Sequence, residues 1–196
     1  MKKIKQPRCF YCNKPSFLGF THPGCKRKNG IDGYVSIYLY NGLFVKLLQE
    51  SKYKGAYVVL KTLLSFSQQN VILNVYEWNK LLKPTIISVP LHSQRLKERG
   101  FNQSDLIMDN YFQSSDYPRK NVLERIINTD HLANMGNKSK RKSHIRGAFQ
   151  FIGQSPPKSI MLVDDVITSG STILECTRTL KENGIQTVLA FSLAKG

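Results

Sequence analysis

Apolar residues along the chain alternate between short β-rich runs and stretches with helical spacing. The β-rich runs predict strands over residues 34–40, 85–90, 122–128, 159–163 and 186–193. Helical spacing predicts helices over residues 43–50, 56–69, 96–111 and 171–183. Because strands that alternate with helices form parallel sheets, we predict a doubly wound α/β domain whose ligands bind at the carboxyl ends of the strands.

Two regions lack this pattern. Residues 1–30 contain turn residues and little periodicity, as expected for a segment held by a metal rather than by a core. Residues 129–146 are polar and basic, which predicts a long mobile loop. We therefore divide the chain into an N-terminal segment, residues 1–30, and an α/β domain, residues 31–196.

Four potential metal ligands lie within the N-terminal segment. Cys9 and Cys12 form a C-x-x-C pair, and His22 and Cys25 form an H-x-x-C pair ten residues later. Two such pairs can place four ligands tetrahedrally on a structural Zn²⁺. A redox C-x-x-C is the alternative, but that motif normally opens a helix in an α/β unit, and we favour zinc. Cys176 stands alone in a helical apolar pattern and is expected in the core.

The charge of the chain is strongly and unevenly positive. Its 196 residues carry a net charge of +16, and residues 158–196 are neutral, with four basic and four acidic side chains. The excess therefore lies upstream and indicates an anionic partner. No apolar run is long enough to span a membrane, and no apolar region follows the basic N-terminus, so we expect a cytoplasmic protein, or one peripheral to the inner membrane.

Two basic clusters favour phosphate binding over simple solvation, although solvated loops remain the alternative for each. Aromatic residues near the first cluster suit single-stranded nucleic acid, whose bases stack on exposed rings. The residues assigned to DNA binding are Lys26, Arg27 and Lys28 in the first cluster and Lys138, Lys140, Arg141 and Lys142 in the second.

The most informative chemistry lies between residues 160 and 172. A buried strand delivers Asp164 and Asp165 at its carboxyl end, and a loop of hydroxyl residues around Gly170 opens the next helix. Backbone N–H groups of such a loop bind phosphate at the helix N-terminus. Because two carboxylates would repel that phosphate, we expect them to face vicinal sugar hydroxyls, with Mg²⁺ nearby.

This segment resembles the binding motif for 5-phosphoribosyl-1-diphosphate (PRPP) of type I phosphoribosyltransferases, in which two acids between apolar pairs precede T-x-G-x-T. The resemblance implies a type I phosphoribosyltransferase-like sheet that binds PRPP with Mg²⁺. The two acids would contact the ribose hydroxyls, the loop would hold the 5′-phosphate, and residues 88–92 would lie near the diphosphate. The implied PRPP-binding residues are Asp164, Asp165, Val166, Ile167, Thr168, Ser169, Gly170, Ser171, Thr172, Ser88, Val89 and Arg99.

A second resemblance covers nearly the whole chain. Residues 88–92 read S-V-P-L-H and residues 99–103 read R-G-F-N-Q, which is similar to the signature of the competence protein F (ComF/ComFC) family. Further matches are K-Y-K-G at residues 52–55, Arg141 and G-A-F at residues 147–149, and His22 stands where the family usually has a zinc cysteine. The resemblance implies a role in natural transformation, in DNA import across the inner membrane beside a helicase-type ATPase and a membrane DNA channel.

Three functions follow from these observations. The first is a DNA-uptake factor that binds single-stranded DNA and PRPP. The second is an active phosphoribosyltransferase of nucleotide metabolism, and the third is a regulator that senses PRPP without turnover. An acceptor for a ribosyl group is not evident in the sequence.

Overall fold

Four parallel strands form the main sheet of the protein. The computed structural model describes residues 2–42, 46, 57–65, 72–113, 117–128 and 145–196. The strand order is β1-β6-β5-β2, and all neighbouring pairs are parallel. The bounds are β1 (Gly33–Leu39), β2 (Thr85–Ser88), β5 (Ser159–Ile167) and β6 (Thr187–Lys195). The carboxyl ends of all four strands therefore meet at one edge of the sheet.

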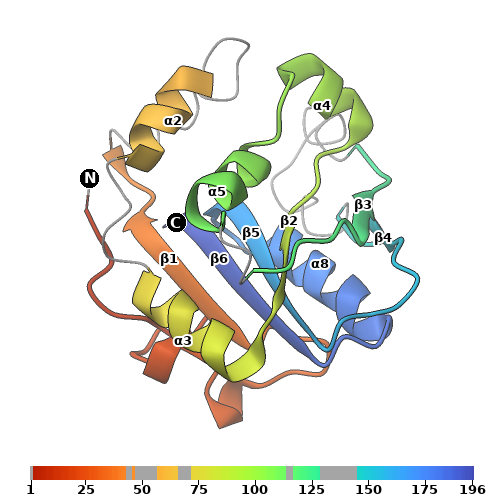
Figure 1. Ribbon diagram of the computed structural model, residues 1–196. Coiled ribbons are helices and arrows are strands. Elements are labelled where there is room, and N and C mark those ends of the chain that lie inside the picture. Colours follow the sequence, from red (N-terminus) through yellow and green to blue (C-terminus); the bar gives the residue numbers. More distant parts are fainter. Residues whose placement is uncertain (1, 43–45, 47–56, 66–71, 114–116, 129–144) are drawn as a thin grey trace.

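Helices cover both faces of this sheet, as Figure 1 shows with α3 and α5 in front of the strands and α8 behind them. One face packs against α2 (Tyr57–Ser65), α3 (Ile72–Leu82) and α5 (Gln103–Tyr111), and the other against α8 (Ser171–Glu182). The short α4 (Ser93–Arg99) precedes α5, and β3 (Leu123–Arg125) and β4 (Phe149–Phe151) form a separate antiparallel pair. The predicted α/β class, with a parallel sheet flanked by helices, is confirmed.

Alternating apolar residues fix which face each strand side chain joins. On β6, Leu189 and Phe191 pack with Trp78 of α3, whereas Val188 and Ala190 pack on the opposite face. All five are fully buried, because a parallel sheet is covered on both sides. Cys176 is also fully buried, which confirms its predicted place in the core.

The N-terminal segment lies along the outer edge of β1. Lys3 pairs antiparallel with Tyr38, and the Ile4 N–H donates to the Ile37 carbonyl over 2.8 Å. Two 3-10 turns follow, η1 (Phe17–Gly19) and η2 (Pro23–Cys25). The segment therefore satisfies backbone groups that an edge strand would otherwise expose.

The structure changes several predicted elements. The predicted helix over residues 96–111 is wrong as a single element, because Gly100 ends α4 in a left-handed conformation (φ +81°) and Asn102 caps α5. Neither α3 nor β4 was predicted, and β5 runs four residues further than predicted. Residues 129–144, most of the predicted helix at 43–50, and residues 66–69 of the helix predicted over 56–69 lie outside the described residues. In the described part of the chain, no helix combines the length and apolarity that crossing a membrane requires.

Candidate functional site

The four predicted metal ligands come together in the N-terminal segment. One ligand atom from each of Cys9, Cys12, His22 and Cys25 lies within 4.8 Å of the others. Local turns create this arrangement: Asn13 N–H donates to the Cys9 carbonyl over 3.0 Å, and Cys25 N–H donates to the His22 carbonyl over 2.8 Å. A Cys3His set at this spacing fits tetrahedral Zn²⁺, and the group could hold such an ion.

The second ring nitrogen of His22 supports this assignment. His22 Nδ1 lies 3.3 Å from Cys12 Sγ, and Nε2 lies 3.0 Å from the Pro15 carbonyl, so that Nε2–H donates to Pro15. Nδ1 is then free of a proton and faces the thiols, which is the usual arrangement of a metal-binding histidine.

The thiols also favour a bound cation. Burial raises the pKa of Cys9, but backbone hydrogen bonds from Cys12, His22 and Tyr11 outweigh this and lower the pKa to about 6. Desolvation and the neighbouring sulfurs of Cys12 and Cys9 raise the pKa of Cys25 to about 11. A metal ion bound between the Cys9 thiolate and the Cys25 sulfur would favour ionisation of both, because it neutralises their combined negative charge.

Aromatic side chains attach this segment to the sheet. Phe10 makes an edge-to-face contact with Tyr34 of β1, with ring centroids 5.5 Å apart. The Tyr11 hydroxyl accepts a hydrogen bond from the Ile31 N–H over 3.0 Å. Both residues between Cys9 and Cys12 thus contact the part of the chain that follows the metal-ligand segment.

The two acids lie at the carboxyl end of β5 in different environments. Asp164 is only 9% exposed, and its Oδ1 accepts hydrogen bonds from Ser104 Oγ over 3.3 Å and from the Asp165 N–H over 2.9 Å. Asp165 is half-buried, and its Oδ1 accepts from the Val166 N–H over 2.7 Å. Burial, and then the neighbouring Asp165, raise the pKa of Asp164 well above its ordinary value. A nearby cation would offset this cost of ionisation.

The predicted phosphate loop lies between β5 and α8. Thr168 and Ser169 are exposed, whereas Gly170 is buried with φ +74°, and Ser171 begins the helix. A Cβ atom on residue 170 would lie 2.7 Å from Cζ of Phe10. Two features therefore favour glycine at position 170. The backbone is left-handed there, and the Phe10 ring leaves no space for a side chain.

The residues predicted near the diphosphate lie on and beside β2. Ser88 is paired with Val163, and the Val89 N–H donates to the Val163 carbonyl over 2.9 Å, so both are next to Asp164 in the sheet. Asn102 Nδ2 donates to the Val89 carbonyl over 3.1 Å. Arg99 ends α4, with Nη1 3.4 Å from Gln103 Oε1. Asn102 of the second sequence signature thus contacts the end of β2, and Ser104, which directly follows that signature, contacts Asp164.

Only one of the two predicted DNA-binding clusters can be placed. Lys26, Arg27 and Lys28 are exposed and directly follow Cys25, with the Arg27 guanidinium 4.4 Å from the centre of the Tyr11 ring. The other cluster lies outside the described residues; it comprises Lys138, Lys140, Arg141 and Lys142.

Four residues of the site were not assigned these structural roles from the sequence. Asn102 and Ser104 stand in and after the R-G-F-N-Q match, which was the available signal for both. Phe10 lies between two of the candidate metal ligands, Cys9 and Cys12, and an apolar residue at that place was the available signal for a packing contact. Lys195 ends β6 with Nζ 3.2 Å from Asn13 Oδ1, a contact across 182 residues that has no local sequence signal.

Comparison with known proteins bears on the process in which this site works. No protein-family model matches the chain. The chain is 28% identical to Competence protein F of Haemophilus influenzae over 201 residues, covering 99% of this chain and 87% of that protein. It is 26% identical over 171 residues to Competence protein ComFC of Streptococcus pneumoniae, covering 87% and 71%.

A further relative carries a related name. DNA utilization protein YhgH of Escherichia coli K12 is 31% identical over 117 residues, which cover 58% of this chain and 50% of that protein. Together with the two competence proteins, this relative supports the assignment of the chain to the competence protein F family.

Proposed function

We propose that the protein acts in natural transformation, binding single-stranded DNA and PRPP with Mg²⁺ while DNA is imported across the inner membrane. The observation that carries the proposal is the pair Asp164 and Asp165 near the carboxyl end of β5, followed two residues later by a glycine-containing hydroxyl loop that leads into α8. Relatives named for competence and DNA utilization indicate the process.

The chemistry of these residues fits Mg²⁺ and PRPP. Carboxylate oxygens are suitable partners for Mg²⁺ and for ribose hydroxyls, and the backbone N–H groups of residues 168–172 suit a 5′-phosphate. When bound, Mg²⁺ would supply positive charge that balances the diphosphate. Asp164 is already oriented by Ser104 and by the Asp165 N–H, so little side-chain ordering is needed on binding.

The wider proposal follows from the same resemblance. The parallel sheet would be of the type I phosphoribosyltransferase kind, and the protein would work in the cytoplasm or at the inner face of the membrane. There it would act beside a helicase-type ATPase and a membrane DNA channel.

An active phosphoribosyltransferase of nucleotide metabolism is the second candidate. Both acids and every position of the loop are intact, which favours it. The two candidates share PRPP binding and differ in turnover, so release of pyrophosphate from PRPP in the presence of candidate acceptors distinguishes them.

Calorimetry with PRPP in the presence and absence of Mg²⁺ tests the shared site. We expect Mg²⁺-dependent binding by the unmodified protein. The double variant Asp164→Asn with Asp165→Asn should lose it, because the side chains keep their shape but lose the charge that holds the cation. Far-UV circular dichroism should stay unchanged in the variant.

Asp109→Asn is the matched control, because Asp109 is exposed on α5 and pairs with Arg119 at 2.5 Å. It should bind PRPP as the unmodified protein does. Undiminished PRPP binding by the double variant would refute the assignment of the two acids. In a separate measurement, anisotropy with labelled single-stranded DNA should show affinity that falls steeply with salt.

A further inference from the structure

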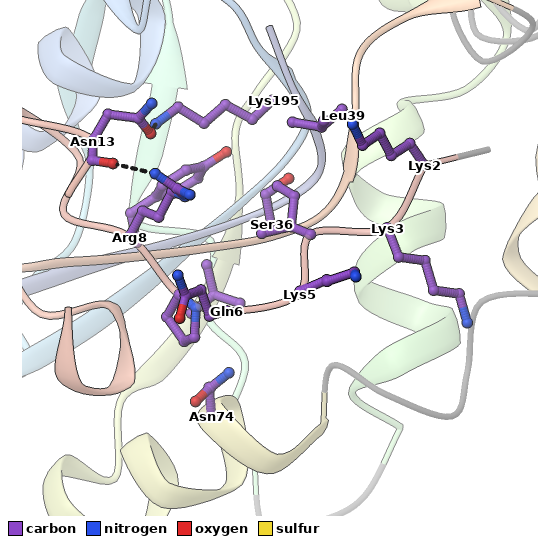
Figure 2. Close-up of a pocket in the computed structure, with 14 residues that line it drawn as sticks. Lys2, Lys3, Lys5, Gln6, Arg8, Asn13, Ser36, Leu39, Asn74 and Lys195 are labelled. Atoms are coloured by element: carbon purple, nitrogen blue, oxygen red, sulfur yellow. Dashed lines mark hydrogen bonds between the residues drawn. The ribbon is translucent and has the colours of Figure 1, made fainter. Parts of the chain in front are cut away.

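A basic cavity lies beside β1, and neither Asp164 nor Asp165 lines it. Its volume is about 930 Å³, and it is bounded by residues 2–8, by β1 and by the end of β6. Five cationic side chains line it, namely Lys2, Lys3, Lys5, Arg8 and Lys195, and no Asp or Glu does. Figure 2 shows Lys2, Lys3 and Lys5 toward one end and Arg8 with Lys195 toward the other.

These positive charges are not neutralised by acids. Within the described parts of the chain, none of the five cations has a carboxylate within ion-pair distance. Arg8 Nη1 donates to the Asn13 carbonyl over 2.7 Å, and Lys195 Nζ donates to Asn13 Oδ1, so both find neutral acceptors. Burial, and then the charge of Arg8, lower the pKa of Lys195, as expected for cations held together.

The backbone holds the cations in place. Lys3 pairs antiparallel with Tyr38, the Leu39 N–H donates to the Lys2 carbonyl over 3.0 Å, and Arg8 pairs with Pro15 at the other end of the segment. Residues 2–8 are therefore fixed at both ends. A preformed set of cations binds anions with less loss of conformational freedom than a free tail does.

The spread of the charges indicates the kind of anion. Cations at both ends of a cavity suit a ligand with several phosphates along its length, rather than one compact phosphate. Lys195 is paired in register with Ile167, so the cavity ends beside the phosphate loop, although Asp164 and Asp165 do not line it. A flexible single strand can follow such a path, whereas a duplex is too stiff to bend into it.

We propose that this cavity binds consecutive phosphates of single-stranded DNA, as a site separate from the PRPP pocket. The inference rests on the proposed single-strand binding and locates it on residues 2–8 and Lys195. It adds to the sequence-based assignment, which placed DNA on residues 26–28 and 138–142.

A charge-matched pair of triple variants tests the site in the full chain. The first variant replaces Lys2, Lys3 and Lys5 with Gln. The control variant also replaces three lysines with Gln, and these are exposed and outside the cavity: Lys80, Lys83 and Lys158. Anisotropy with a labelled mixed-sequence single strand is measured from low to high salt. With each phosphate contact contributing a slope of about 0.7, the first variant should lose about 2 from the log–log salt slope and ~10-fold or more in affinity.

The affinity of the control variant for the single strand should stay within about 3-fold of that of the unmodified protein. Thermal melts should confirm that both variants fold. Equal losses in the two variants would overturn the cavity as a specific site while leaving single-strand binding intact. Absence of single-strand binding by the unmodified protein would instead overturn the proposed function. Displacement of the strand by inorganic pyrophosphate at equal phosphate concentration would overturn the proposal in favour of a small-anion site.

Discussion

At the scale of single residues, Asp164 shows how a buried carboxyl group costs stability. Its carboxyl group is buried beside Asp165, and these two causes, in that order, raise its pKa. In the unfolded chain the group ionises near its ordinary value of about 4. The folded protein therefore loses stability as the pH rises from that value through the raised pKa of Asp164.

We expect Asp164→Asn to stabilise the protein in the absence of ligand. The amide oxygen can still accept from Ser104 and from the Asp165 N–H, but it carries no charge to bury. At pH 7–8 the free energy of unfolding should rise by about 1 kcal/mol or more. Urea unfolding without Mg²⁺ measures this, and the gain should vanish near pH 3. A gain that is equal at both pH values would contradict the explanation.

At the scale of elements, Asn102 connects the two parts of one sequence signature, residues 88–92 and residues 99–103. Its Oδ1 accepts from the Ser104 N–H over 3.1 Å and so caps α5, while its Nδ2 donates to the Val89 carbonyl after β2. One buried side chain thus sets the start of a helix and the position of the loop beside the acids.

Replacing Asn102 separates these two roles. Ser at this position keeps a helix cap but is too short to reach Val89, whereas Ala loses both bonds. We expect unfolding free energies lower by about 1 kcal/mol for Asn102→Ser and about 2 kcal/mol for Asn102→Ala. Both should weaken PRPP binding in calorimetry. Full PRPP affinity in the Ser variant would show that the bond to Val89 does not position the loop.

The elements also show which features the sequence could predict. The grouping of the four candidate metal ligands and the placement of the two acids were predictable because short spacings fix them. Two residues separate the ligands within each pair, and the acids are adjacent near a strand end. The contact of Ser104 with Asp164 spans 60 residues, and no local pattern selects that hydroxyl. The break at Gly100 was readable as a helix end before a cap, but apolar periodicity continues across it. β4 has three residues, too few to show alternation.

At the scale of the whole molecule, the N-terminal segment and the phosphate loop are in direct contact. Phe10 lies between two metal ligands in the sequence, and its ring lies against Gly170. It also contacts the rings of Tyr11 and Tyr34. A metal bound to the cysteines would therefore hold one wall of the candidate PRPP site.

We expect metal removal and Phe10→Ala each to weaken PRPP binding. The expected loss of affinity is about 5-fold, which is at the lower end of typical coupling between two sites. A zinc-selective chelator, followed by excess Mg²⁺, isolates the effect of zinc in calorimetry. Phe17→Ala is the matched control, because Phe17 lies in the same segment and is 79% exposed. Unchanged PRPP affinity after verified zinc loss would contradict the coupling.

The strand order has a consequence for how the chain reaches its fold. In the described part of the chain, β1 pairs within the sheet with β6, and Gly33 meets Leu189 across 156 positions. Such distant pairing makes folding slow, because the chain loses much entropy before the contact forms. The four candidate metal ligands, which lie within residues 9–25, can come together long before β6 is available for pairing. Metal binding would then order residues 2–8 along one edge of β1 before β6 pairs with the other edge.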